Sequence, residues 1–260
     1  MNDSNRTAIV TGAAQGIGRR TSELLAENGY AVALVDLHST NQIARALREK
    51  GGAALDFPGD ISDERAVRDL AARVENEWGQ IDLLVNNAGI SCISPAEETS
   101  AQQFRRVLEI NLVAPFLLAR TFGAKMIARR KGAIVNVASI AGLVGVSDRA
   151  AYNASKHGLI GLTRTLAAEW GGRGVRVNAV CPGWVKTEMD VADQSSGGYT
   201  DDDIIGRVPM ARFASPDDIA KAILFLADDR MSSFVNGHTL VVDGGWTSDG
   251  SWESLRLRHR

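Results

Sequence analysis

The chain is poor in cysteine, proline and aromatic residues, with two cysteines, six prolines and 6% aromatic residues among its 260 residues. Cys92 and Cys181 lie far apart and without the spacing of metal ligands. A disulfide-stapled fold and the common zinc patterns are therefore excluded, and we predict no metal site. Because Cys181 ends an apolar run, we expect it to be a reduced, buried thiol.

An excess of charge of one sign is also missing. The formal net charge of −2 leaves no basic field, which argues against nucleic acid or an anionic membrane as a partner. No apolar run approaches the roughly 20 residues of a membrane-spanning helix. Residues 1–7 are polar and lack the apolar centre of a signal peptide. We expect a cytoplasmic protein that binds no membrane.

What remains is globular composition, with 45% hydrophobic and 23% charged residues. Short runs that are apolar at nearly every position alternate with stretches of helical periodicity, as in parallel strands covered on both faces. The runs are 7–10, 31–35, 53–57, 81–85, 133–137, 175–180 and 239–242, and the helix candidates include 16–28, 63–77, 104–128 and 152–170. This alternation predicts an α/β fold, a doubly wound parallel sheet of the Rossmann type, forming a single domain over residues 1–260.

Two segments depart from the alternation. Residues 188–212 form a long polar stretch with flexible glycines and a few apolar side chains, which predicts a lid over a ligand, although a merely mobile segment would have the same composition. The tail at 246–260 carries Trp246 and Trp252. Those tryptophans are consistent with packing, possibly on another subunit, but a frayed terminus fits the composition almost as well.

A glycine-rich turn between the first strand and the first helix predicts a nucleotide site. The segment from Thr11 reads TGAAQGIG, with Gly12, Gln15, Gly16, Ile17 and Gly18 as candidate cofactor residues. Glycines let the backbone turn tightly and approach a pyrophosphate, which sits on free N–H groups at a helix N-terminus. Such a turn alone is weak evidence, and its position between strand and helix is what favours a nucleotide.

Asp36 ends the second strand about 20 residues past the glycines, where an acid accepts hydrogen bonds from the adenosine ribose. Its carboxylate would repel the 2′-phosphate of NADP, and neither Leu37 nor His38 offers a counter-charge. We therefore predict NAD rather than NADP as the cofactor. The alternative is that Asp36 caps the next helix.

With these residues, the chain resembles the short-chain dehydrogenase/reductase family over nearly its whole length. The resemblance rests on the glycine motif, NNAG at 86–89, Asn111, Ser139, Tyr152-x-x-x-Lys156 and Pro182-Gly183, all in the family's order. It implies that Asp60 and Ile61 meet the adenine, and that Thr187 and Val185 meet the nicotinamide carboxamide. Further cofactor contacts implied in the same way are Asn87, Ala88, Gly89, Pro182 and Gly183. Asp60 and Thr187 could instead serve only as turn or cap residues.

The spacing of Tyr152 and Lys156 puts their side chains on one helix face, one turn apart. A phenol with a pKa of about 10 is a poor base at neutral pH, and a nearby ammonium together with bound NAD would lower that pKa. Tyr152 could then accept the alcohol proton as hydride leaves for the nicotinamide. Ser139, after the fifth strand, could hold the substrate oxygen.

The resemblance gives Lys156 a second role on the nicotinamide ribose, and gives Asn111 a water-binding role in a proton relay through Lys156. Taken singly, each catalytic candidate has a structural alternative. A Tyr-x-x-x-Lys pair is usually a helix face, a serine after a strand is usually a turn, and Asn111 could kink its helix. Their joint occurrence beside a nucleotide site favours catalysis.

The substrate is predicted only as a small molecule with a secondary alcohol or ketone, with a polyol or sugar ahead of other classes. The pocket candidates mix apolar and polar side chains and are Ser91, Ser139, Ala141, Arg149, Trp184, Met189 and Tyr199. A 3-oxoacyl-thioester reductase acting on a carrier protein is the main alternative, with basic residues 129–131 and Arg173 as a docking site. A catalytically idle nucleotide-binding protein is another alternative. The resemblance further implies a homo-oligomer, a tetramer or dimer, formed through helices 104–128 and 152–170. Leu108, Leu112, Phe116 and Leu117 fit that face or an internal core.

Overall fold

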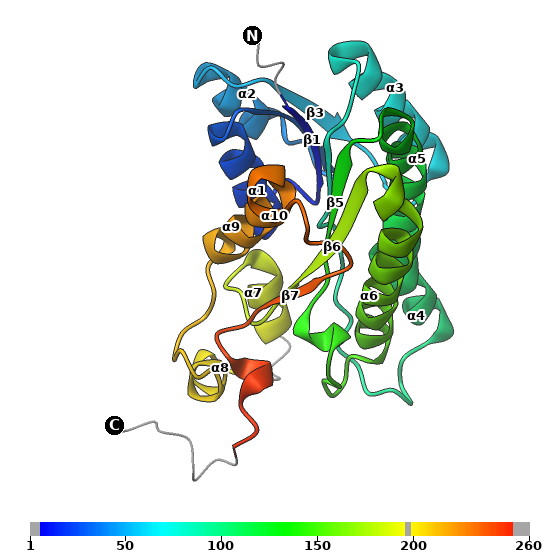
Figure 1. Cartoon of the computed structure of the whole chain (residues 1–260). Helices are drawn as coiled ribbons and strands as arrows, with labels where there is room; N and C mark the ends of the chain where they lie inside the picture. Colours follow the sequence, from blue (N-terminus) through cyan, green and yellow to red (C-terminus); the bar gives the residue numbers. More distant parts are fainter. Residues whose placement is uncertain (1–5, 196–198, 252–260) are drawn as a thin grey trace.

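A single parallel sheet of seven strands runs through the centre of the molecule, in the order β3-β2-β1-β4-β5-β6-β7 (Figure 1). The computed structural model describes residues 6–195 and 199–251. The strands are β1 (Arg6–Thr11), β2 (Tyr30–Asp36), β3 (Ala54–Pro58), β4 (Leu83–Asn86), β5 (Gly132–Val137), β6 (Val175–Pro182) and β7 (Thr239–Val242). The order reverses direction between β1 and β4, which creates the crevice where such folds bind ligands. The predicted doubly wound sheet is confirmed.

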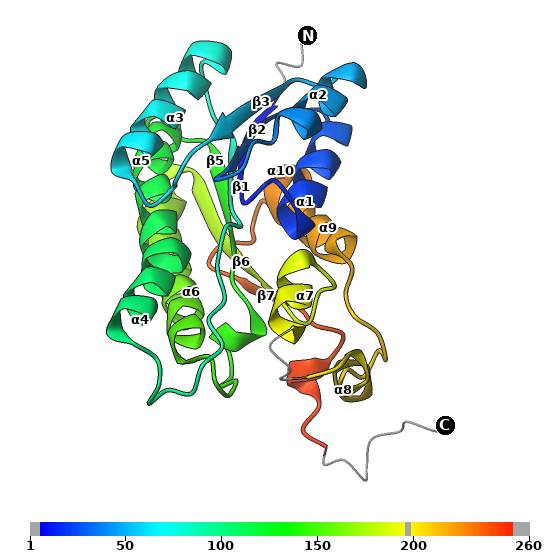
Figure 2. The ribbon, with the colours of Figure 1, turned by 180° about the vertical axis from the view of Figure 1, so that it is seen from behind.

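Helices cover both faces of the sheet, as Figure 2 shows from behind. One layer holds α1 (Gly16–Glu27), α2 (Asn41–Glu49), α9 (Pro216–Ala227) and α10 (Asp229–Ser232), and the other holds α3 (Glu64–Trp78), α4 (Ala101–Leu108), α5 (Ala114–Arg129) and α6 (Ala150–Trp170). The central strands have no solvent-facing side because two separate hydrophobic clusters form, one under each layer. This double burial explains why the runs are apolar rather than alternating.

The helix predicted over 104–128 is not one regular α-helix. α4 and α5 are joined by a π-helical turn, Glu109–Val113, which contains Asn111. The continuous helical stretch Ala101–Arg129 is long and apolar enough to span a membrane, but 56% of its most apolar window is buried within the molecule. We therefore assign this stretch to the layer of helices that packs on one face of the sheet.

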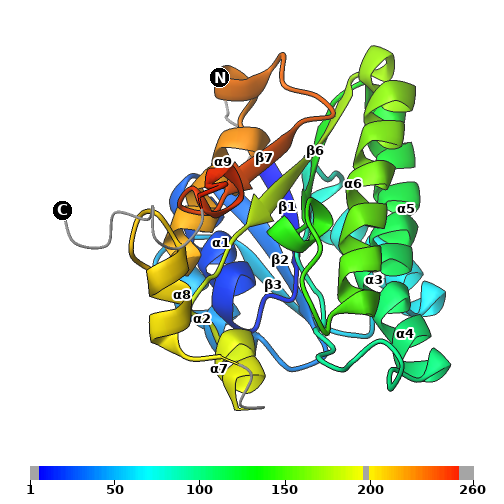
Figure 3. The same ribbon diagram turned by 90° about the horizontal axis from the view of Figure 1, so that it is seen from below.

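The predicted lid segment contains two short helices, α7 (Glu188–Gln194) and α8 (Asp201–Arg207). Both lie beyond the carboxyl edge of the sheet, on the side of α1 and α9, as the view onto that edge shows (Figure 3). In the tail, Trp246 begins a 3₁₀ turn, Trp246–Ser248, and the Arg207 guanidinium lies 4.9 Å from its ring centre. Trp252 and the rest of the predicted tail lie outside the described residues.

Candidate active site

A cavity of about 430 Å³ opens at the carboxyl edge of the sheet, where β1, β2, β4, β5 and β6 end. Its walls come from the glycine loop after β1, the segments after β2 through β6, the start of α6, and α7. Parallel strands bring all of these loops to one edge, so residues far apart in sequence meet in one place.

The glycine loop is held in a shape that only glycine allows. Gly12 has a positive φ of 66°, and a Cβ on Gly18 would lie 2.1 Å from the Gly12 carbonyl oxygen. The Asn87 amide donates to the carbonyls of Thr11 and Gly12, at 2.9 and 3.2 Å. The Thr11 hydroxyl in turn accepts from the backbone N–H groups of Asn87 and Ala88. The loop is thus braced against the segment after β4, which leaves a cradle for a phosphate group.

Asp36 lies at the end of β2 and faces the same cradle. Its carboxylate accepts hydrogen bonds from the Ala14 and His38 backbone N–H groups, both at 3.0 Å. It does not cap α2, whose N-cap residue is Thr40. The structure therefore assigns Asp36 to the glycine loop and the cavity wall rather than to the next helix.

Asp60 and Thr187 line the cavity and also have local roles, Asp60 in the turn before α3 and Thr187 as the N-cap of α7. Asp60 accepts from the backbone and the hydroxyl of Ser62, and these bonds together with Arg106 keep the pKa of its carboxyl low against the opposing effect of burial. The Thr187 hydroxyl accepts from the Asp190 N–H at the start of α7. The turn and cap roles left open by the sequence are confirmed, and because both side chains also line the cavity, their predicted cofactor contacts stay a prediction.

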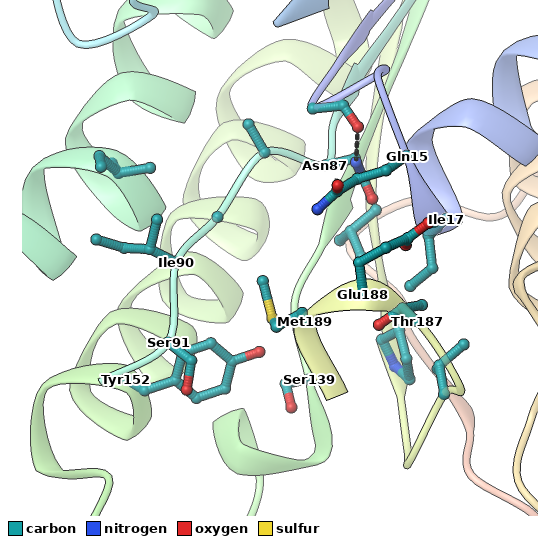
Figure 4. A pocket seen from close by; sticks show the side chains of 18 of the residues that line it. Gln15, Ile17, Asn87, Ile90, Ser91, Ser139, Tyr152, Thr187, Glu188 and Met189 are labelled. Atoms are coloured by element: carbon teal, nitrogen blue, oxygen red, sulfur yellow. Dashed lines mark hydrogen bonds between the residues drawn. The ribbon is translucent and has the colours of Figure 1, made fainter. Parts of the chain in front are cut away.

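Tyr152, Ser139 and Lys156 all line the cavity, and Figure 4 shows Tyr152 and Ser139 on the same wall. Ser139 lies close enough to Tyr152 for its hydroxyl to lower the pKa of the phenol, and this hydroxyl accepts from the Ala141 N–H at 3.1 Å. The Lys156 ammonium lies 5.5 Å from the centre of the Tyr152 ring and donates to the Val137 carbonyl at 2.8 Å. A proton acceptor, a hydrogen-bond partner for a substrate oxygen and a buried cation are thus within reach of one point.

Burial dominates the electrostatics of Tyr152 and Lys156. Burial raises the pKa of the Tyr152 phenol, and the neighbouring Ser139 hydroxyl only partly opposes this. Burial also lowers the pKa of Lys156 to about 8. In the protein without cofactor, desolvation thus outweighs the neighbouring charges, and the lowering predicted from the ammonium together with bound NAD stays a prediction.

Asn111 is buried and does not line the cavity. Its amide accepts from the Ile90 N–H at 2.9 Å and donates to the Ile90 carbonyl at 3.0 Å and to the Ser155 hydroxyl at 3.1 Å. The side chain predicted to bind a water is thus engaged in holding the loop after β4 against α6. The interruption of the helix that was the structural alternative is real, since the π-helical turn contains this residue.

The substrate side of the cavity is built around an ion pair that the sequence did not suggest. Arg149, three residues before Tyr152, contacts the Asp193 carboxylate of α7 at 3.3 Å, and Ser91 donates to the same carboxylate at 3.2 Å. The Arg149 guanidinium also lies 5.7 Å from the Trp184 ring centre and 5.9 Å from that of Tyr199. Asp193 thus ties α7 both to the residue before α6 and to the loop after β4.

The structure brings nearly all of the predicted residues to this one cavity. The predicted cofactor residues line it except Gly18, which packs against Gly12 instead, and every predicted substrate residue lines it. Glu188, Asp190 and Asp193 are lining residues that sequence reasoning missed. The three-residue spacing of the two aspartates on one short helix was the available sign, but their partners, Tyr199 for Asp190 and Arg149 for Asp193, are visible only in three dimensions.

Comparison with known proteins gives the same assignment. The family model described as enoyl-(acyl carrier protein) reductase matches residues 12–247. The D-threitol dehydrogenase of Mycolicibacterium smegmatis is 43% identical over 244 residues, which is 93% of this chain and 93% of that protein. The chain belongs to the short-chain dehydrogenase/reductase family.

Solved structures of family members superpose closely. One from Beutenbergia cavernae, described as an NAD(P)-dependent gluconate 5-dehydrogenase with NADP bound, is 40% identical with a TM-score of 0.89, covering 95% of this chain and 98% of that one. A gluconate 5-dehydrogenase from Burkholderia cenocepacia in complex with NADP and tartrate is 33% identical with a TM-score of 0.88, covering 95% and 96%. The chain is thus an oxidoreductase that moves hydride between a nicotinamide cofactor and a secondary alcohol or ketone, and the glycine cradle of the cavity fits that cofactor.

Proposed function

We propose that the protein is an NAD-dependent dehydrogenase of a polyol or sugar. The observation that carries the cofactor part of this proposal is Asp36, whose carboxylate faces the cavity where an adenosine ribose would lie. Ribose hydroxyls donate to a carboxylate, whereas a 2′-phosphate would be repelled by it. The structures from Beutenbergia cavernae and Burkholderia cenocepacia were solved with NADP, so the assignment to NAD rests on this chain's own residues.

The catalytic roles follow from the geometry of the three side chains on the α6 wall. Ser139 holds the substrate oxygen and Tyr152 accepts the alcohol proton, in line with their shared place on one wall of the cavity. Lys156, fixed by the Val137 carbonyl, holds the nicotinamide ribose and stabilises the phenolate. Asn111 acts indirectly by fixing the loop at Ile90. The nicotinamide, when bound, supplies the hydride acceptor.

The remaining cofactor contacts are proposed as the resemblance implies. Asp60 and Ile61 lie at the adenine end, and Val185 and Thr187 at the nicotinamide end, all of them in the cavity wall. The substrate contacts proposed are Ser91, Ala141, Arg149, Trp184, Met189 and Tyr199, which line the part of the cavity next to Tyr152 and α7. The D-threitol dehydrogenase relative supports a polyol as the substrate class.

A 3-oxoacyl-thioester reductase acting on a carrier protein is the second candidate, favoured by the carrier-bound substrate in the name of the matching family model, enoyl-(acyl carrier protein) reductase. The position of the basic residues predicted for carrier docking argues against it. Arg129 ends α5 just before β5, and Arg173 lies just before β6, so both are at the amino edge of the sheet, opposite the cavity. Arg129 is also occupied with the Ile81 carbonyl and Asp82.

We also propose that the protein is a cytoplasmic homo-oligomer, a dimer or tetramer. Phe116 and Val113 are large apolar side chains that stay exposed, by 41% and 36%, on the outer face of α5 and of the π-helical turn. Leu117, by contrast, is buried in the fold and leaves the predicted interface set. Sedimentation at micromolar concentration tests this, and a monomer would overturn it.

The experiment that tests the proposed function follows reduced-nicotinamide absorbance with NAD and NADP separately. The panel contains polyols, sugars, sugar acids and simple secondary alcohols, with thioester ketones in the reducing direction. We expect turnover of a polyol or sugar with NAD. Turnover only with NADP, or only of thioesters, would replace this proposal with the reductase alternative.

A further inference from the structure

The acidic side chains of the cavity outnumber the basic ones. Among the described residues that line it, the only lysines and arginines are Arg149 and Lys156. The carboxylates are more numerous and are Asp36, Asp60, Glu188, Asp190 and Asp193. Lys156 is held by the Val137 carbonyl on the catalytic wall, so Arg149 is the one guanidinium on the substrate side. A carboxylate substrate would need this residue as its partner.

Arg149 is already engaged by a carboxylate of the protein. Its side chain is 11% exposed and contacts Asp193, whose side chain is 19% exposed, at 3.3 Å. The rings of Trp184 and Tyr199 flank the guanidinium, so its position is fixed from several sides. Breaking a largely desolvated ion pair to admit another anion leaves the Asp193 carboxylate without its counter-charge, which is costly.

The second aspartate of α7 adds to the negative charge. Asp190 is buried, accepts from the Tyr199 hydroxyl at 3.1 Å, and has its ion-pair partner, Lys186, outside the cavity lining. Asp190 and Asp193 are three residues apart on α7, so both carboxylates face the same wall. Carboxylates accept hydrogen bonds from alcohols but repel anions.

We propose that Asp193 is a specificity-determining residue that selects neutral polyols over sugar acids, by accepting a substrate hydroxyl and by neutralising Arg149. This inference rests on the proposed function and narrows it, because it assigns the substrate class to a neutral polyhydroxy alcohol. The hydroxyl that reacts lies at Ser139 and Tyr152, and a neighbouring hydroxyl donates to Asp193. Ser91 donates to the same Asp193 carboxylate at 3.2 Å, so Asp193 ties α7 to the loop after β4 as well as to Arg149.

The test compares threitol with its four-carbon acid, threonate, and uses tartrate as an inhibitor. In the wild type with NAD we expect threitol to be the better substrate and tartrate to inhibit weakly. Asp193→Asn leaves Arg149 without its carboxylate partner, so we expect kcat/KM for threitol to fall at least 10-fold. The ratio of threonate to threitol should rise at least 30-fold, and tartrate should inhibit at least 10-fold more strongly. Asp193→Ser, which introduces no amide into α7, should change the substrate ratio and the inhibition by tartrate in the same direction.

The matched control is Asp202→Asn, which removes the same charge from an exposed position in α8 that does not line the cavity. Its substrate ratio and its inhibition by tartrate should match the wild type. Equal losses with threitol and threonate in both Asp193 variants, with NADH binding retained, would overturn the proposal and leave Asp193 a purely structural role. A wild type that prefers threonate would also overturn it, whereas failure to oxidise any polyol or sugar with NAD refutes the proposed function itself.

Discussion

The backbone N–H of Ala14 donates a 3.0 Å hydrogen bond to the Asp36 carboxylate, which ties the glycine loop to the end of β2. The other carboxylate oxygen of Asp36 accepts from the His38 N–H. A single charged side chain thus organises both the phosphate side and the ribose side of the proposed cofactor site. The effect of its charge can be separated from that of its hydrogen bonds, because an asparagine at this position removes the charge and keeps one acceptor oxygen.

Asp36→Asn should therefore change cofactor preference more than stability. We expect kcat/KM with NADP to rise, since the repulsion of its 2′-phosphate is removed, and kcat/KM with NAD to fall. The combined change in the NAD-to-NADP ratio should be at least about tenfold, which corresponds to about 1.4 kcal/mol. Initial rates with both cofactors measure it, with Asp202→Asn as the control. An unchanged ratio would show that Asp36 serves only the loop.

Tyr152→Phe removes the proposed base and leaves the ring. Turnover should fall by about 10²–10⁴-fold, while NADH binding measured by fluorescence should remain close to that of the wild type. The control is Tyr30→Phe, at the opposite edge of the sheet at the start of β2. A variant with near-normal kcat would show that another group accepts the proton.

The pH dependence of the wild type provides a second test of the same residue. Burial raises the pKa of Tyr152, so at neutral pH the phenol is protonated and alcohol oxidation depends on a minor deprotonated form. We expect kcat/KM for oxidation to increase as pH rises through the neutral range, and the reverse reaction to be favoured as pH falls. A flat oxidation profile between about pH 6 and 8 would contradict the assignment.

The sequence was sufficient for the features that depend on local pattern. The buried strands were visible as apolar runs, and the glycine turn, Ser139, Tyr152 and Lys156 were visible from their position relative to those runs. Features that depend on pairing across the fold were not visible. The π-helical turn at Asn111 is fixed by Ile90, 21 positions earlier, and Arg149 meets Asp193 44 positions later. The residue types alone do not indicate which residues distant in sequence will pair in the fold.

Asn111→Ala should affect both stability and activity. The substitution leaves the N–H and carbonyl of Ile90 without the partners they have at 2.9 and 3.0 Å, and a buried polar group left unpaired costs about 1–3 kcal/mol. Because the same loop lines the cavity, KM for NAD should rise as well. Chemical denaturation and steady-state kinetics measure the two effects. Asn28→Ala, at the exposed end of α1, is the control, and unchanged stability in the Asn111 variant would refute the positioning role.

Lys156→Met should abolish activity and yet stabilise the protein without cofactor. Burial lowers the pKa of Lys156 from its ordinary 10.5 to about 8. At pH 7 the Lys156 side chain is therefore charged in the folded protein although it is poorly solvated there. Between about pH 8 and 10.5 the unfolded chain binds a proton that the folded chain has released, so the contribution of this residue to the unfolding free energy increases with pH across that window. Below it the full penalty applies.

Methionine removes this penalty and also the hydrogen bond to the Val137 carbonyl, which offsets part of the gain. We expect the unfolding free energy at pH 7 to rise by about 1–3 kcal/mol, and the difference from the wild type to shrink as pH approaches 10. Lys50→Met, at an exposed position after α2, should show neither effect. An increase in unfolding free energy that stays constant with pH would mean that the methionine stabilises by packing rather than by removing a buried charge. A decrease at pH 7 would mean that burial of the lysine charge does not destabilise the wild type. The expected result would show that this cation is kept for catalysis at the expense of stability.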